Sequence, residues 1–320
     1  MRILLAVDGS TPADRAVDLL ASLPWVGDDR LRILSVAPSR DDVLGVPWGM
    51  PPPDAAEIEA AVLRVHRDAV ERAEREIRSV RADVSIEPVL MRGRAASVIV
   101  DQAGEFGADL VVVGHRGLGT WESRLLGSVS AEVVDHAPCP VLVARDDQIG
   151  RVVLADDGSP DARAAAQLVV DWPLFRGLAV TVVGVVDDGF PYAAAVAPPL
   201  YAETMQLYTE AVAAERRSRA AECGSVADRL RDAGIDASVA IRNGDPAHEI
   251  VAAARATGAG LVVVGTRGRT GLQRLILGSV ARNVLLSAPC SVLVVRAGVR
   301  APGRHPADVR PGREVLSAFG

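Results

Sequence analysis

The stretch GADLVVVGHRGLGTWESRLLGSVS, residues 107–130, decides the fold, because it returns as GAGLVVVGTRGRTGLQRLILGSVA at residues 258–281. Upstream, LLAVDGSTPADRAV from residue 4 matches VLADDGSPDARAAA from residue 153, and downstream HAPCPVLVAR from residue 136 matches SAPCSVLVVR from residue 287. The offset is 149 residues from Asp8 to Asp157 and 151 residues from Gly107 to Gly258. A period of this size is a whole domain, so we predict a tandem duplication with domains at residues 1–146 and 151–296.

Each copy alternates apolar strands with helical segments. In the first copy we expect strands at residues 2–7, 31–37, 84–90, 109–113 and 141–145, and helices at residues 12–22, 55–80 and 95–105, with a fourth opening at Gly127. Ser10 or Thr11 would cap the first helix. Continuous runs such as LVVV are typical of parallel strands buried on both faces. The alternation predicts an α/β fold with two tandem doubly wound domains of the Rossmann-like or flavodoxin-like kind. The Pro- and Gly-rich tail, residues 297–320, is predicted to be disordered.

Composition narrows the function further. The 320 residues are 49% hydrophobic with a net charge of −6, which argues against a general nucleic-acid binder. All 35 basic residues are arginines, so neither a P-loop lysine nor a Schiff-base lysine exists. We find no signal peptide and no membrane span, and expect a cytoplasmic protein. The matching Cys139 and Cys290 are expected to be small buried thiols.

A glycine-rich motif, G-x2-G-x9-G-S, follows the fourth strand in both copies. It consists of Gly114, Gly117, Gly127 and Ser128 in the first copy, and of Gly265, Gly268, Gly278 and Ser279 in the second. We expect its first two glycines to adopt unusual φ angles and to present backbone N–H groups to a ligand. The Gly-Ser pair begins a helix, where unpaired N–H groups and the helix dipole attract an anion. The serine hydroxyl would donate to a phosphate or ligate a phosphate-bound Mg²⁺.

Residues at the ends of the first and second strands would complete each site. Ligands of open parallel sheets bind beyond the carboxyl ends of the strands, where the strand order reverses. Asp8 and Asp157 would accept from a ribose hydroxyl or an adenine amine, and Val36 and Val185 would offer an apolar wall. The full predicted set adds the wall residues Ala6 and Ala155, the loop arginines Arg116 and Arg267, and the helix residues Val129 and Val280. These residues alone indicate only a phosphate-bearing ligand.

The motif and its context resemble the universal stress protein family in its tandem, ATP-binding form, over residues 1–145 and 151–296. The resemblance implies a five-stranded parallel sheet of order 3-2-1-4-5 in each copy and ATP, with Mg²⁺, as the ligand. Adenine would lie beside Asp8 and Val36, with the phosphates on Gly117, Gly127 and Ser128. It also implies that the domains pair through their last strands, Val141–Arg145 and Val292–Arg296. Exposed strand edges invite such pairing, and they leave a homodimer open.

The chain departs from the family pattern at a few positions. Ala6 and Ala155 stand where relatives often have glycine, and a methyl group there would narrow the ribose wall. His115 replaces a small residue that copy two keeps as Thr266, and Trp121-Glu122 stand where copy two has Gly271-Leu272. The second site therefore matches the family better than the first.

The sequence argues against two alternatives to a nucleotide-binding protein and leaves a third open. A dehydrogenase needs G-x-G-x-x-G after the first strand, where this chain has Asp8-Gly9-Ser10, and a response-regulator receiver needs a lysine. ATP hydrolysis needs a positioned water and usually a cation, for which Arg116 and Arg267 are candidates. The sequence offers no convincingly positioned base, so any turnover should be slow. We therefore expect a non-enzymatic ATP-dependent sensor or regulator, with a slow ATPase or phosphotransfer protein as the alternative.

Overall fold

The computed structural model describes residues 1–24, 29–40, 42, 54–117, 126–187, 201–268 and 277–298. They form two compact units, Met1–Gln148 together with Ser291–Val294, and Ile149–Cys290 together with Val295–Ala297. Beyond its first two residues, the predicted disordered tail at 297–320 lies outside the described residues. Trp121, Glu122, Gly271 and Leu272 also lie outside them.

The first unit contains a parallel sheet in the order β3-β2-β1-β4-β5. Its strands are β1 (Arg2–Ala6), β2 (Arg30–Ala37), β3 (Ser85–Arg92), β4 (Leu110–Gly114) and β5 (Val141–Ala144). In the register, Ile3 of β1 lies opposite Leu31 on one side and Leu110 on the other. The predicted order 3-2-1-4-5 is confirmed. Residues Ser291–Val294 run antiparallel to β5, with Leu293 opposite Leu142.

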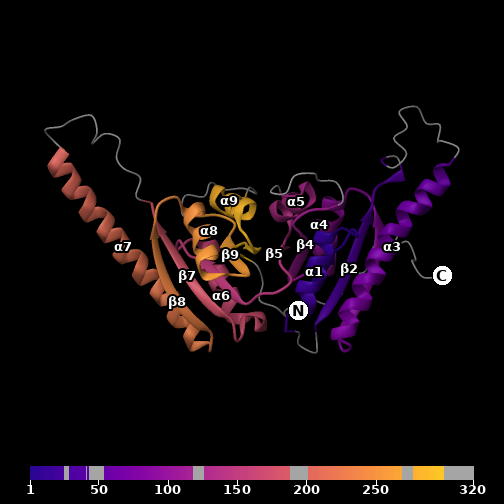
Figure 1. Ribbon diagram of the computed structural model, residues 1–320, viewed down its shortest axis with the longest axis horizontal. Coiled ribbons are helices and arrows are strands. Elements are labelled where there is room, and N and C mark those ends of the chain that lie inside the picture. Colours follow the sequence, from indigo (N-terminus) through magenta and orange to yellow (C-terminus); the bar gives the residue numbers. More distant parts are fainter. Residues whose placement is uncertain are drawn as a thin grey trace. The chain divides into compact units, whose positions relative to one another are not determined.

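Helices cover this sheet on both faces, which is why every residue of β4 and β5 is buried. Helix α1 (Thr11–Ser22) packs against α3 (Ala55–Val80), and α4 (Ala95–Phe106) packs against α5 (Ser128–His136). The long helix α3 runs beside β2 and β3, as Figure 1 shows. The fold is therefore doubly wound, as the sequence predicts.

The second unit repeats the arrangement, with strand order β8-β7-β6-β9 and then β10. Its strands are β6 (Arg151–Ala155), β7 (Ala179–Val186), β8 (Asp236–Asn243) and β9 (Leu261–Gly265). Of β10 (Ser291–Val295), only Val295 belongs to this unit, and Ser291–Val294 belong to the first. Its helices are α6 (Pro160–Asp171), α7 (Tyr201–Asp232), α8 (Pro246–Thr257) and α9 (Ser279–Ser287), with the short 3₁₀ helix η1 (Pro173–Phe175). Helix α7 lies along β7 and β8 as α3 does along β2 and β3 (Figure 1).

Serine caps the first helix of each unit. Ser10, not Thr11, is the N-cap of α1 and accepts from the N–H of Ala13 at 3.3 Å, while Thr11 is the first helical residue. Ser159 does the same for α6, accepting from Ala162 at 3.1 Å. These caps fix the turn that directly follows β1 and β6, where the predicted site aspartates stand.

The cysteines are buried free thiols, as predicted for Cys139 and Cys290. Burial raises the pKa of Cys139 to about 12, so this thiol stays protonated at neutral pH. Among the described residues, no helix is long and apolar enough to cross a membrane.

Candidate functional site

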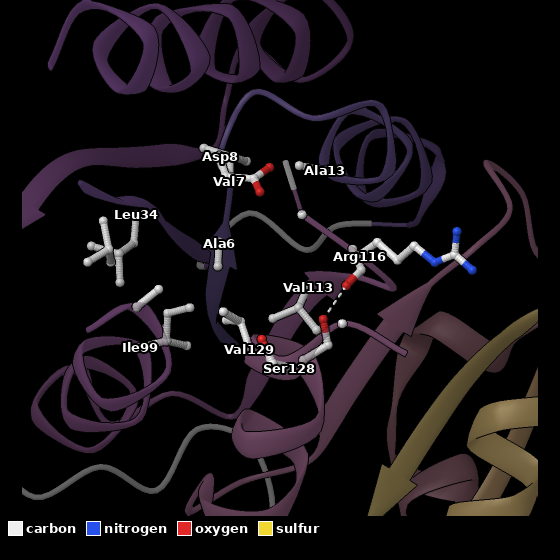
Figure 2. A pocket seen from close by; sticks show the side chains of 16 residues that line it. Ala6, Val7, Asp8, Ala13, Leu34, Ile99, Val113, Arg116, Ser128 and Val129 are labelled. Carbon is white, nitrogen blue, oxygen red and sulfur yellow. Dashed lines mark hydrogen bonds between the residues drawn. The ribbon is translucent and has the colours of Figure 1, made fainter. Parts of the chain in front are cut away.

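A cavity of about 280 Å³ opens beyond the carboxyl ends of β1 and β4 in the first unit. All nine residues predicted for the first site line it: Ala6, Asp8, Val36, Gly114, Arg116, Gly117, Gly127, Ser128 and Val129. Figure 2 shows Ala6, Asp8 and Val113 around this space, with Leu34 and Ile99 on one side and Arg116 extending away from them. The fold therefore gathers the predicted residues, from three separate sequence segments, around one cavity.

The second unit has a matching cavity of about 530 Å³. Its lining likewise contains all nine residues predicted for the second site: Ala155, Asp157, Val185, Gly265, Arg267, Gly268, Gly278, Ser279 and Val280. Ligand pockets usually measure ~300–1,000 Å³. The second cavity lies within this range, while the first lies just below it.

In both units the aspartate after the first strand faces the glycine-rich turn. A Cβ added to Gly117 would stand 2.5 Å from Asp8 Oδ2, and a Cβ added to Gly268 would stand 2.8 Å from Asp157 Oδ2. The other oxygen holds the local turn: Asp8 Oδ1 accepts from the N–H and hydroxyl of Ser10 at 3.0 and 2.6 Å. One carboxylate oxygen of each aspartate thus accepts hydrogen bonds from the turn that follows it, and the other oxygen faces the glycine-rich loop.

The prediction of unusual φ angles at the first two glycines of the motif is wrong. Gly114, Gly117, Gly265 and Gly268 are all absent from the positive-φ glycines of the described chain. Close approach explains them instead: a Cβ on Gly114 would stand 2.6 Å from the carbonyl oxygen of Pro12, and one on Gly265 2.8 Å from Asp161 Cβ. The glycines therefore let β4 and β9 press against the starts of α1 and α6.

The Gly-Ser pair begins a helix in both units, as predicted. Gly127 is the N-cap of α5 and Gly278 that of α9, and neither receives a side-chain cap. The Gly127 N–H donates to the carbonyl of His115 at 2.9 Å, and the Gly278 N–H donates to Thr266 at 2.7 Å. These two N–H groups are therefore committed to the loop, which leaves the first turn of each helix, from Ser128 and Ser279 onward, as the anion-attracting end.

A model of the universal stress protein family matches residues 1–145 and 148–296. The chain belongs to the universal stress protein family. A universal stress protein of Mycolicibacterium smegmatis is 30% identical over 307 residues, covering 92% of this chain and 96% of the relative. One from Thermus aquaticus is 36% identical over 146 residues, covering 45% of this chain and 97% of its own length.

The fold of the family is seen in a solved structure as well. A universal stress protein from Archaeoglobus fulgidus superposes with a TM-score of 0.60 at 21% identity, covering 93% of this chain and 98% of the other. A relative as short as the Thermus aquaticus protein matches about one copy. The family thus contains both single and tandem forms, and this chain is a tandem one.

The sequence analysis predicted only a few of the apolar residues that line the two cavities. In the first cavity Leu34, Ala95, Ile99 and Val113 join Val36. In the second, the corresponding wall is Val183, Pro246, Ile250, Val264 and Val185. In the sequence these residues look like ordinary core positions. They line the cavities because the starts of α4 and α8 lie beside the carboxyl ends of the strands.

The loop arginine of the second unit forms an ion pair with the start of α6. Arg267 Nε donates to Asp161 Oδ2 at 3.1 Å, and its side chain is 36% exposed. In the first unit His115 lies close by: burial and the charges of Arg145, Arg116 and Arg15 lower its pKa, against a backbone hydrogen bond with Ala144 that raises it. His115 is therefore neutral at pH 7 and does not add to the cationic charge of the first loop.

Proposed function

We propose that each unit binds ATP and that the protein acts as a nucleotide-dependent regulator of the universal stress type. The observation that carries this proposal is the close approach of the first-strand aspartate to the glycine-rich turn, which recurs at Asp8–Gly117 and Asp157–Gly268. It supports a single compact ligand that touches both motifs. A helix N-terminus at the same cavity supports an anionic end on that ligand.

The proposed pose divides the nucleotide along the cavity. The apolar wall around Val36 or Val185 would receive the adenine ring, and Asp8 Oδ2 or Asp157 Oδ2 would accept from a ribose hydroxyl or the adenine amine. The phosphates would lie against the first turn of α5 or α9. Bound Mg²⁺ would supply charge neutralisation on the phosphates, and the hydroxyls of Ser128 and Ser279 would be the side-chain groups that hold it.

Regulation rather than turnover fits the polar groups at the two cavities. Catalysis of phosphoryl transfer needs a group that orients the attacking water. The first unit has His115 beside its loop, whereas the second has Thr266 at that place, so this histidine does not recur. The carboxylates that do recur at the cavities, Asp8 and Asp157, are assigned in the proposed pose to the ribose or the adenine. We therefore propose that bound nucleotide alters the surface around α5 and α9, and that slow hydrolysis is the alternative.

We propose that residues 1–146 and 151–296 are the two functional domains, that their last strands pair within the chain, and that the protein works in the cytoplasm. Neither nucleic acid nor a membrane is proposed as a partner.

Native mass spectrometry and calorimetry with ATP and Mg²⁺ test the proposal. We expect two nucleotides per chain, and loss of both in a variant carrying Gly127→Ala and Gly278→Ala. The added Cβ atoms would stand 3.1 Å from Arg116 Cα and 3.0 Å from the Thr266 carbonyl oxygen, respectively. The matched control carries Gly150→Ala and Gly224→Ala, where a Cβ meets nothing within 4 Å.

Three outcomes distinguish a regulator, an ATPase and a protein that binds no nucleotide. Two bound nucleotides without turnover support the regulator. Multiple turnover of ATP that the Gly127→Ala, Gly278→Ala variant abolishes would replace it with the ATPase alternative. Absence of any adenine nucleotide, co-purified or added, would refute the proposed function altogether.

A further inference from the structure

The two copies end their sheets in edge strands that differ at the centre. Among the described strands, β3 pairs only with β2, and β8 pairs only with β7 (Figure 1). Each edge strand has eight residues, of which the fourth is Pro88 in β3 and Val239 in β8. Pro88 lies opposite Ile33 and Val239 opposite Val182, so the two residues occupy the same place in the repeat.

Hydrogen bonds at the strand ends show which backbone groups of the edge strands point outward. The Gly244 N–H donates to the carbonyl oxygen of Val186 in β7, and the Gly93 N–H donates to that of Ala37 in β2, both at 3.0 Å. Successive residues of a strand direct their N–H and C=O groups to opposite sides. The even-numbered residues of β8 therefore face β7, and its odd-numbered residues face away from the sheet. In β3 the parity is reversed, so Pro88 faces away from the sheet.

The outer edge of β8 keeps the donors that β3 lacks. Proline has no N–H, and its presence on an edge strand hinders pairing with another chain. In β8 the outward-facing Ala237, Val239 and Ile241 all have an N–H. Within the described part of the chain, these outward backbone groups have one partner, Arg231 Nε, which donates to the Ala237 carbonyl oxygen at 2.9 Å. That oxygen has a second lone pair, so it can accept another bond.

Strand β8 is also less covered than β3. Ala237 is its only buried residue, and the side chain of Val239 is 37% exposed. In β3, by contrast, Val89, Leu90 and Met91 are all buried. An unprotected edge strand that carries an exposed apolar residue is a template for pairing with another strand.

The charged residues of β8 indicate which strand it would pair with. In an antiparallel pair of two β8 strands centred on Val239, Asp236 of each strand lies opposite Arg242 of the other. Both side chains point to the same face of the sheet, because the two residues are an even number of positions apart. On that face Arg242 Nε donates to Glu249 of α8 at 2.6 Å, and Asp236 is exposed. Opposite charges would thus meet at both ends of the pair.

The remaining pairs fit the same register. Ala237 would lie opposite Ile241, and Val239 opposite its own copy, so that apolar side chains meet on the other face. These outward-facing residues would form the hydrogen-bonded pairs of the ladder, and the charged residues the closer, non-hydrogen-bonded pairs. Moving the centre of the pair to Ala240 would leave both charges opposite uncharged residues. The strand is therefore complementary to itself in one register.

We propose that β8 is a docking edge for a second copy of this chain, which adds its own β8 antiparallel about a twofold axis at Val239. Such an interface is isologous, since each strand supplies both halves of every pair. The interface uses a different strand from the last strands of the two domains, and it requires no nucleotide.

Sedimentation velocity on the full chain over a range of concentrations tests the proposal. We expect a reversible equilibrium between one chain and two. Val239→Pro gives β8 the residue that β3 has at the same place, removes only an outward N–H, and should leave single chains. Asp236→Arg should weaken association about 10-fold, because two pairs of opposite charge become pairs of like charge. Ser85→Arg, at the matching exposed position of β3, is the control and should associate as the unaltered protein does.

A mixing experiment tests the register. Arg242→Asp alone should also weaken association, since acidic residues then face each other. Mixed with the Asp236→Arg protein, it should form dimers of one chain of each kind, because opposite charges again meet at both ends. Amide hydrogen exchange gives the local readout: the peptide that contains β8 should exchange more slowly in the dimer, and the peptide that contains β3 should not.

Four outcomes would each overturn the proposal. Single chains at every concentration would mean that β8 is open to another protein or to none. A dimer that neither Val239→Pro nor Asp236→Arg weakens must form elsewhere. Failure of the two charge variants to associate when mixed, or equal protection of β3 and β8, would refute the proposed pairing. Should Val239→Pro prevent folding, as judged by near-ultraviolet circular dichroism, the exposed Asp236→Arg and the mixing experiment decide.

Discussion

The substitution Gly117→Ala tests whether ATP binding requires the close approach of the glycine-rich turn to Asp8. The new Cβ would stand 2.5 Å from Asp8 Oδ2, and ordinary contact begins at 3.4 Å, so the oxygen must retreat by about 0.9 Å (3.4 − 2.5). The two bonds that Ser10 donates to Oδ1 resist this movement. Turning a side chain ~30° from its rotamer costs ~0.5–1.5 kcal/mol, and losing a charged hydrogen bond costs ~1.5–3 kcal/mol. We expect ATP affinity at the first site to fall about 10- to 100-fold.

Calorimetry on three variants checks this expectation. Gly268→Ala should weaken the second site less, because its Cβ would stand 2.8 Å from Asp157 Oδ2. Gly104→Ala, whose Cβ meets nothing within 4 Å, is the control and should bind as the unaltered protein does. If Gly117→Ala and Gly268→Ala also bind ATP with unchanged affinity, the carboxylates do not touch the ligand and the proposed pose is wrong.

Three further predictions concern stability, each read from urea unfolding. Gly114→Ala should destabilise the first unit by ~1–3 kcal/mol through overpacking, since its Cβ would stand 2.6 Å from the backbone of Pro12; an unchanged midpoint would contradict this. Gly224→Ala, inside α7 with nothing within 4 Å, should stabilise by up to ~1 kcal/mol, and any loss would count against the helix as described. The pKa of Glu76 is raised to about 7 by its hydrogen bond with Asp18, by burial, and by the charges of Asp18 and Asp14. The charge of Arg72 lowers this pKa, but by less. The stability that its protonation contributes is complete below pH 4.5 and lost as the pH rises through 7, so Glu76→Gln should exceed the unaltered protein in stability at pH 8 but not at pH 5.

The strand order and the lining of both cavities could be predicted because local pattern and topology agree. A run such as Leu110–Gly114 is too short and too apolar for anything but a strand buried on both faces, and the repeated Gly-Ser pair marks a helix start. Once the sheet is parallel, the ends of β1 and β4 must meet at one edge. Asp8 and Gly117 are therefore neighbours by construction.

What the sequence could not supply is the reason for each glycine and the partners of each polar side chain. A motif glycine serves equally for positive φ or for close approach, and only the positions of Pro12 and Asp161 decide between them. Asp161 reads as an ordinary acid in the first turn of a helix, and its three partners come from residues 105 to 136 positions further along the chain. Such contacts depend on packing across the sheet rather than on local sequence.

A backbone hydrogen bond joins the two ends of each glycine-rich segment. Gly127 donates to His115 in the first unit, and Gly278 donates to Thr266 in the second. Doubling the number of residues between these two ends would cost only ~0.6 kcal/mol in closure entropy. The intervening sequences, LGTWESRLL and RTGLQRLIL, differ at most positions, whereas the closing hydrogen bond is present in both units. This segment is where a duplicated domain can acquire a new contact surface without altering its core.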